Sequence, residues 1–496
     1  MSRSKQEQIS LFEDQAQQDG PVTCLGRTFK NDDERRAFFT EKLRQKLPEL
    51  KQMEGFPIGE DEAILALSDP PYFTACPNPW INHFIKEWEE EKRKKYGEEE
   101  EYHREPFAAD VSEGKNDPIY NAHSYHTKVP HKAIMRYILH YTNPGDIVFD
   151  GFAGTGMTGV AAQLCGDREA VESLGYQVKE DGTILDEEGR PFSKLGPRKA
   201  ILNDLSPAAS FIAYNYNTPV DVDTFEREAK RILEEVEQEC GWMYETYHVL
   251  EGQLQTDAFG QPIKGRINYT VWSDVFVCPD CSGEIIFWEA AVDQEQGKVK
   301  DTFTCPTCGA EHTKRSVERA WEVKFDPAIN ETVRQAKQVP VLINYSVGNK
   351  RFDKRPDEHD LALINKIEEM EIPYWFPTDR MPEGYNTEQP KNSHGFTHVH
   401  HFFNKRTLKV MSEFYSLIRN KKYYFVFQNI LRGSISYSTK MVKVNVPRLL
   451  SKGGIFSFGA VTGTLYIPSL NGERNLIDAI ESKINSYIKY VNGNFQ

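Results

Sequence analysis

A strand, a glycine turn and a helix are predicted in succession at residues 148–159, VFDGFAGTGMTG. The apolar run before the turn predicts the strand, and MTGVAAQL after it predicts the helix. Gly154 and Gly156 let the backbone turn sharply and approach a ligand, and the first N–H groups of the helix can face an anionic ligand end. A tight turn without a ligand has the same pattern. The segment therefore predicts an α/β chain with a doubly wound sheet and leaves the ligand open.

A second strand of the same sheet is predicted at KAILNDLSP, which leads to Asp204. An acid at this place usually meets the ribose hydroxyls of a nucleotide-type cofactor, and a turn or capping aspartate is the alternative. The acid lies farther from the glycine turn than the ~20 residues of the dinucleotide fingerprint. Residues 166–197 contain two short alternating runs about an Asp-Gly turn, so an inserted hairpin accounts for the extra length.

The DPPY segment, Asp69–Tyr72, follows an apolar run, and we predict a buried strand over residues 61–72. Pro70 and Pro71 fix the backbone, so their carbonyls and the Asp69 carboxylate form one rigid set of hydrogen-bond acceptors. Such a set can bind an exocyclic NH2 group, and Tyr72 offers a face on which a planar base can stack after it leaves its duplex. Two acceptors that pull on the amine hydrogens free its lone pair for in-line attack on a methyl sulfonium.

These motifs resemble the amino-methyltransferases of DNA, the N6-adenine and N4-cytosine enzymes that use S-adenosylmethionine. DPPY is similar to their catalytic motif, and DGFAGTG to their cofactor motif, with Gly151 where proline is common. The segment HSYHTKVPHKAIMRYILHYTNPGD is similar to the one that precedes the cofactor motif. The resemblance covers roughly residues 61–220.

The resemblance implies roles for the residues of both motifs. Asp69 to Tyr72 would bind and activate the base, and an aspartate here is more typical of adenine enzymes. The glycine turn would hold the methionine end of the cofactor and Asp204 its ribose. The implied cofactor residues are Asp150, Phe152, Gly154, Thr155, Gly156 and Asp204. The resemblance also implies a Rossmann-like sheet and a setting in restriction-modification or phage defence.

Two departures from the family pattern bear on whether this chain contains a complete catalytic domain. Only about fifty residues separate DPPY from the helix before the glycine turn, too few for the usual strands and target-recognition region. Longer relatives carry a further Asp-Pro-Pro motif in a part that has no counterpart here. A partner subunit that completes the catalytic domain is therefore an open alternative. In that alternative the chain is a zinc-containing DNA-binding subunit; methylation of RNA or of a protein amide is a third, weaker hypothesis.

Two Cys-x2-Cys pairs predict a metal site. Cys278 and Cys281 precede Cys305 and Cys308 by 23 intervening residues. Four thiolates on two tight turns suit tetrahedral zinc and leave no ligand position for a substrate, so we predict a structural zinc ribbon; a redox pair is the alternative. The histidines of FTHVHHFF, His398, His400 and His401, have no acidic or cysteine neighbours in the sequence. Surface or core positions are therefore predicted for them.

The 496 residues exceed the size of one core, and we divide them into four parts. These are a tail and helical arm (1–60), the methyltransferase core (61–220), a helix with the zinc ribbon (221–330) and a basic, aromatic C-terminal region (331–496). We expect the first twenty residues to be a mobile tail and the C-terminal region to hold the rest of the sheet. The arm should hold a helix capped by Asn31, and the charged residues 86–105 a solvated helix or a mobile lid.

The C-terminal part is basic although the net charge of the chain is −14. Residues 401–496 carry fourteen Lys and Arg against four Asp and Glu. Interleaved cations and rings suit phosphate contact and base stacking on DNA, and a β-rich core segment with lysines at its surface is the alternative. No apolar run reaches ~18 residues and no secretory signal is evident, so we expect a cytoplasmic protein without a membrane partner.

Overall fold

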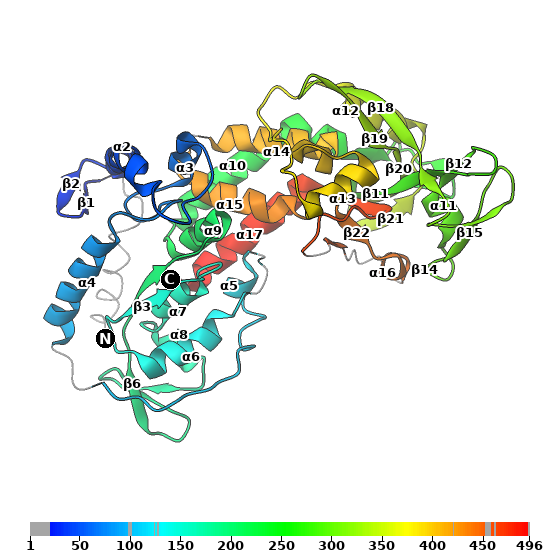
Figure 1. The fold of residues 1–496 in the computed structure, drawn as a ribbon. Helices are drawn as coiled ribbons and strands as arrows, with labels where there is room; N and C mark the ends of the chain where they lie inside the picture. Colours follow the sequence, from blue (N-terminus) through cyan, green and yellow to red (C-terminus); the bar gives the residue numbers. More distant parts are fainter. Residues whose placement is uncertain are drawn as a thin grey trace. The chain divides into compact units, whose positions relative to one another are not determined.

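The computed structural model describes residues 20–97, 102–123, 125, 128–419, 421–451, 458–460 and 463–494. These residues form two compact units (Figure 1). The first unit contains the chain up to residue 226 and the residues from 485 onward, and the second is Arg227–Ile484. The mobile tail predicted for the first twenty residues lies, except for its last residue, outside the described part of the chain.

The first unit mixes helices and short strands. Its elements in chain order are β1 (Val22–Cys24), β2 (Arg27–Phe29), α2 (Asp32–Leu50), α3 (Asp61–Leu67), α4 (Ile81–Tyr96), α5 (Pro118–Asn121), α6 (His131–Tyr141), β3 (Ile147–Asp150), α7 (Met157–Leu164), α8 (Arg168–Glu172), β4 (Gln177–Val178), β5 (Thr183–Leu185), β6 (Pro191–Lys194), β7 (Lys199–Leu202) and α9 (Pro207–Asn217). Helix α10 (Val222–Cys240) begins in the first unit and continues into the second.

Helix α2 confirms the predicted helical arm. The side chain of Asn31 accepts a hydrogen bond from the Glu34 N–H at 2.9 Å, which satisfies one of the free donors of the first turn. Phe39, Leu43 and Leu47 are buried at helical spacing against α3 and the β1–β2 hairpin. Of the charged residues 86–105, those up to 96 lie in helix α4, in which no residue is fully buried, in agreement with a solvated helix. Residues 98–101 lie outside the described part of the chain.

The strand predicted over residues 61–72 is wrong, because Asp61–Leu67 form helix α3. Asp61 and Glu62 lie in its first turn, where the helix dipole favours negative charge. Ile64 and Leu65 are buried in the cluster that α2 covers. A short apolar run fits a buried strand and a buried helix equally well, so its periodicity could not decide between them.

Strands β3 and β7 lie parallel, with Ile147 opposite Lys199 and Asp150 opposite Leu202. This is the predicted order of strand, glycine turn, helix and strand. Within the described residues these two strands form a sheet of their own, so the structure contains a small part of the predicted Rossmann-like sheet. The inserted hairpin is confirmed as β4, β5 and β6, which form an antiparallel sheet between α7 and β7.

The second unit is built on an antiparallel sheet in the order β21-β20-β11-β24-β22-β23, and β8, β12 and β17 also pair with β11. Its strands are β8 (Glu245–Tyr247), β9 (Val249–Leu250), β10 (Gln253–Leu254), β11 (Lys264–Val277), β12 (Glu284–Ile286), β13 (Val292–Asp293), β14 (Lys298–Val299), β15 (Thr302–Thr304), β16 (Glu311–Thr313), β17 (Glu318–Arg319), β18 (Trp321–Asp326), β19 (Glu331–Ala336), β20 (Gln338–Val347), β21 (Lys350–Lys354), β22 (Val442–Val444), β23 (Phe458–Ala460) and β24 (Leu470–Arg474).

The helices of the second unit lie mostly in its C-terminal half. They are η1 (Gly241–Tyr244), α11 (Phe287–Ala291), α12 (Glu358–Glu369), α13 (Tyr385–His394), η2 (Val399–Phe402), α14 (Lys405–Ile418), α15 (Tyr424–Ile435), α16 (Val446–Leu450) and α17 (Leu476–Asn494), whose last turns belong to the first unit. Strand β24 pairs with β11 and β22, so the C-terminal strands extend the sheet of the second unit and not the β3–β7 pair.

The basic, aromatic segment at residues 401–435 packs as the core of the second unit. The rings of Phe414, Tyr423 and Phe427 are buried and cannot stack on bases in this structure. Arg406 is buried too, and it donates to both carboxylate oxygens of Glu473 at 3.0 and 2.7 Å. The alternative of a β-rich core segment is therefore confirmed in that these residues are buried. It is wrong in their secondary structure, because α14 and α15 are helices. None of the described helices is long and apolar enough to cross a membrane.

Candidate active site

The DPPY segment forms a tight turn after helix α3. The N–H of Asp69 donates to Phe73 O at 2.9 Å, and the Phe73 N–H donates back to Asp69 O at 3.0 Å. Asp69 and the two prolines are buried, whereas Tyr72 is 38% exposed. Pro71 O accepts a hydrogen bond from Asn78 Nδ2 at 2.8 Å. The turn thus holds one carboxylate and two proline carbonyls close together.

Three side chains from other elements donate hydrogen bonds to the Asp69 carboxylate. Arg35 Nη1 and Arg36 Nε, both from helix α2, reach Oδ1 at 2.8 and 2.9 Å. Tyr214 of helix α9 donates its hydroxyl to Oδ2. The chain spacing gave no signal for these partners, which lie 33 or more residues away in the sequence.

The ionisation state of Asp69 follows from these partners. Burial acts to raise the pKa of Asp69, but the charges of Arg36 and Arg35 outweigh it and hold the pKa below its usual value. Burial, together with the adjacent Asp69 charge, raises the pKa of Tyr214 well above its usual value. Asp69 therefore stays an ionised acceptor at neutral pH, and Tyr214 stays a protonated donor.

The glycine turn joins β3 to helix α7. Gly154 and Gly156 have φ angles of +53° and +74°, in the left-handed region that favours glycine. The Gly154 N–H donates to Asp204 Oδ2 at 2.9 Å, and Asp150 accepts from the Phe152 N–H at 3.1 Å. The two acids thus lie at the C-terminal ends of the two parallel strands, and one of them is bonded to the glycine turn itself.

Alanine at Gly156 is expected to destabilise the protein by about 2–5 kcal/mol. A left-handed non-glycine residue costs about 1–2 kcal/mol and an overpacked site about 1–3 kcal/mol, and a Cβ at Gly156 would lie 2.7 Å from Ala213 Cβ. Gly154→Ala is the matched control, because its Cβ would meet nothing nearer than Tyr125 at 3.7 Å. Urea unfolding measures both variants, and an equal loss in the two would contradict the close approach of Gly156 to α9.

Helix α9 packs against both motifs of the first unit. Ala213 faces Gly156 closely, and Asn217 Nδ2 donates to Gly156 O at 3.1 Å. The residue after Ala213 is Tyr214, which donates to Asp69 and stacks on Phe73 with ring centroids 5.0 Å apart. The acceptor turn and the glycine turn are therefore held by one helix.

The C-terminal ends of β3 and β7 fit S-adenosylmethionine by the chemistry of their groups. Ligands of α/β sheets bind outside the carboxyl ends of neighbouring parallel strands. Here Asp204 offers oxygens for hydroxyls, and Phe152 offers an apolar ring that is 85% exposed. Thr155 Oγ1 is buried and has no hydrogen-bond partner among the described residues, which leaves a polar atom for a ligand.

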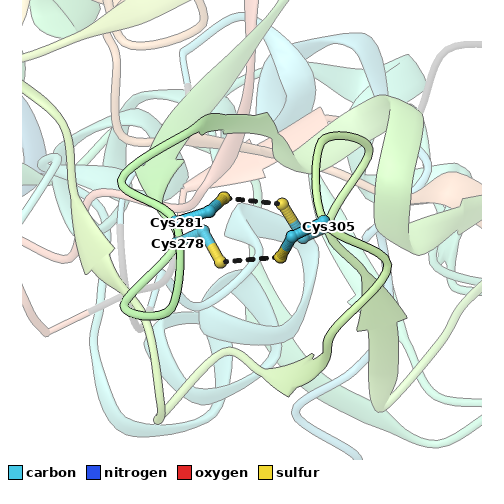
Figure 2. Close-up of side chains that lie close together, drawn as sticks. Cys278, Cys281 and Cys305 are labelled. Atoms are coloured by element: carbon cyan, nitrogen blue, oxygen red, sulfur yellow. Dashed lines mark hydrogen bonds between the residues drawn. The ribbon is translucent and has the colours of Figure 1, made fainter.

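The four cysteines converge in the second unit (Figure 2). Cys278 Sγ lies 3.7 Å from Cys308 Sγ, and Cys281 Sγ lies 3.7 Å from Cys305 Sγ. The two turns repeat one pattern, because the Cys278 N–H bonds to the carbonyl five residues later at 2.9 Å and the Cys305 N–H does the same. This cluster of four thiols is compatible with zinc. The sequence had given no signal for His312, whose Nε2 lies 3.2 Å from Cys278 Sγ.

Surface or core positions were predicted for the histidine cluster, and its two most buried members lie in the core. His400 and His401 are buried, and both place Nε2 within 3.0 Å of Asp326 Oδ2. Asp326 is an acidic neighbour that the sequence spacing did not reveal. The Thr397 N–H donates to His401 Nδ1, so His401 Nε2 carries the proton and donates to Asp326. Asp326, His400 and His401 also lie close enough together to hold one metal ion. Burial lowers the pKa of His401 to about 4.

In a comparison with known protein families, residues 23–184 match a family described as DNA methylase. Neither the curated proteins nor the solved structures give a match. The matched residues include the DPPY segment and the glycine turn, and they end before β7 and the cysteine cluster. The chain therefore carries, over residues 23–184, a DNA methylase domain of the N6/N4 methyltransferase family.

Proposed function

We propose that this chain transfers a methyl group from S-adenosylmethionine to the exocyclic amine of a flipped base in DNA, adenine N6 before cytosine N4. The observation that carries the proposal is helix α9, which contacts Gly156 through Ala213 and Asp69 through Tyr214. A methyl donor over the glycine turn and an amine at Asp69 would therefore both lie beside residues that helix α9 contacts. The preference for adenine rests on the aspartate of the DPPY motif.

The residues of the acceptor turn would do the chemistry on the amine. Asp69, ionised at neutral pH, and Pro70 O would accept its two hydrogens, and Tyr72 would stack on the ring. S-adenosylmethionine supplies an electrophilic methyl group. The nitrogen lone pair, released from the ring, would take the methyl group, the sulfur would leave as a neutral thioether, and the proton that the amine loses would pass to solvent. The cofactor would be held by Asp150, Phe152, Gly154, Thr155, Gly156 and Asp204.

A structural zinc ion and a biological setting complete the proposal. A zinc ion bound by Cys278, Cys281, Cys305 and Cys308 would be structural, because four thiolates fill a tetrahedral site. The same apolar cluster contains Cys278, Cys305 and Phe303, so the ion would stabilise the fold around it. Restriction-modification or phage defence in the cytoplasm is the setting that the resemblance supports.

A second candidate function is supported by the exposure of strands β3 and β7. Parallel sheets are normally buried on both faces, yet none of the eight residues in these strands is buried, and Phe149 is 70% exposed. In this alternative a partner polypeptide adds further strands, and the chain alone binds DNA without turning over.

Methyl transfer from labelled S-adenosylmethionine to unmethylated duplex DNA by the purified chain tests both candidates. Label in DNA, identified by mass spectrometry as N6-methyladenine or N4-methylcytosine, supports the enzyme. Cofactor binding without label in DNA supports the incomplete subunit. Label in RNA or protein but not in DNA would contradict DNA as the substrate.

A further inference from the structure

One nitrogen of Arg35 donates to the two acceptors that the target amine needs. Arg35 Nη1 lies 2.8 Å from Asp69 Oδ1 and 2.7 Å from Pro70 O. This nitrogen is a planar NH2 group, which resembles the exocyclic amine of adenine or cytosine in its geometry and in its two donors. We call Asp69 Oδ1, Pro70 O and the Tyr72 ring the base subsite.

The rest of the Arg35 guanidinium also lies where a base would lie. Its central carbon is 4.9 Å from the centroid of the Tyr72 ring, at the distance of a stacked cation–π contact. Arg35 is 1% exposed and Asp69 is 3% exposed, so no base can reach these acceptors while the guanidinium remains. A planar group with an NH2 at its edge and an aromatic ring on its face therefore fills the base subsite.

We infer that Arg35 is an internal mimic of the target base and that helix α2 must release it before a base can enter. This inference rests on the proposed function, because it takes Asp69, Pro70 and Tyr72 as the base subsite. The competition is direct, since Arg35 and the base would use the same lone pairs and the same ring face.

The structure also shows what holds the mimic in place. Asp32 Oδ1 accepts hydrogen bonds from Arg35 Nε at 3.0 Å and from Nη2 at 2.7 Å. Asp32 is the first residue of α2, and Arg35 lies one turn later. Unwinding or tilting of this first turn would withdraw the guanidinium. Arg36 would remain as the cationic partner of Asp69, and the Tyr214 hydroxyl as a neutral donor.

The test compares Arg35→Gln with Arg36→Gln, which removes a cationic donor from the same Asp69 oxygen. The probes are deoxyadenosine and deoxycytidine monophosphate, titrated into the full chain and followed by saturation-transfer NMR. Arg35→Gln is expected to bind at least one of them about tenfold more tightly than the wild type, a change of about 1.4 kcal/mol. Arg36→Gln is expected to show no such gain. Equal or weaker binding by folded Arg35→Gln would overturn the inference.

Asp32→Asn serves as a second variant if Arg35→Gln does not fold. It weakens the hold on the guanidinium and leaves the hydrogen bonds of Asp69 in place, so a smaller gain in nucleotide affinity is expected, and no gain would count against the mimic.

Methyl transfer to unmethylated duplex DNA separates the two proposals. A gain in nucleotide binding without methyl transfer by any variant would sink the enzyme proposal alone. If the wild type methylates DNA, and Arg35→Gln loses this activity and gains no affinity for nucleotides, the inference about Arg35 is contradicted and the proposed function is not.

Discussion

Replacement of Asp69 by alanine is expected to lower kcat for methyl transfer to DNA by about 10²–10³-fold, the usual effect of removing one polar group that stabilises a transition state. Asp69 would accept the amine hydrogen that must be drawn away for the nitrogen lone pair to react. The variant should still bind S-adenosylmethionine, because the glycine turn is unchanged. Single-turnover methylation with labelled cofactor measures the loss.

The same variant should lose stability, and this must be separated from catalysis. Removal of one partner from a buried ion pair costs about 3–5 kcal/mol, and Arg35, which is 1% exposed, would keep Asp32 as its carboxylate partner and lose Asp69. Tyr214→Phe is the matched control, since it removes one donor to Asp69 and keeps the acceptor. If folded Asp69→Ala retained more than about a tenth of the wild-type rate, Asp69 would not be the acceptor that the mechanism needs.

Replacement of Cys278 by serine is expected to abolish zinc binding and to lower the Tm of the second unit by about 10 °C or more. A change of 1 kcal/mol shifts Tm by about 2–4 °C in a domain of this size, and structural zinc contributes about 10–16 kcal/mol in small zinc domains. Cys278 is fully buried and packs in the same apolar cluster as Phe276 and Phe303. Metal analysis and thermal unfolding give the two readouts.

Cys240→Ser is the control for this experiment, because Cys240 is equally buried in the second unit and lies outside the four-cysteine cluster. It should keep its zinc. Cys305→Ser is measured in parallel, since His312 lies close enough to Cys278 to take its place as a ligand. Wild-type zinc content in both Cys278→Ser and Cys305→Ser would remove the zinc assignment.

Local signals predicted the elements that carry their own start and stop residues. The Asn31 cap predicted helix α2, and the glycine turn between apolar runs predicted β3 and α7. Residues 61–67 lack such signals. Their apolar residues fit either state, and only packing against α2 makes them a helix. The number of strands beside β3 was equally hidden, because a parallel strand has the same apolar pattern in a sheet of two strands or of seven.

The candidate site was predictable in its motifs and not in its partners. The DPPY segment and the glycine turn are contiguous stretches, and the chemistry of each residue type suggests its role. Arg35, Arg36 and Tyr214 meet Asp69 only through tertiary packing, and no spacing rule connects residues 33 to 145 positions apart. The rings of Phe414 and Phe427 illustrate the same limit, since their composition suggested a surface for DNA and their burial places them in a core.

Helix α9 sets the distance between the methyl-donor site and the amine site of the proposed reaction. Because neighbouring residues of one rigid rod touch the glycine turn and the acceptor turn, the donor-to-acceptor distance is set by two side chains and not by the length of chain between the motifs. The segment between the two motifs, which contains helix α4, can therefore lengthen or shorten in related chains while this distance stays constant.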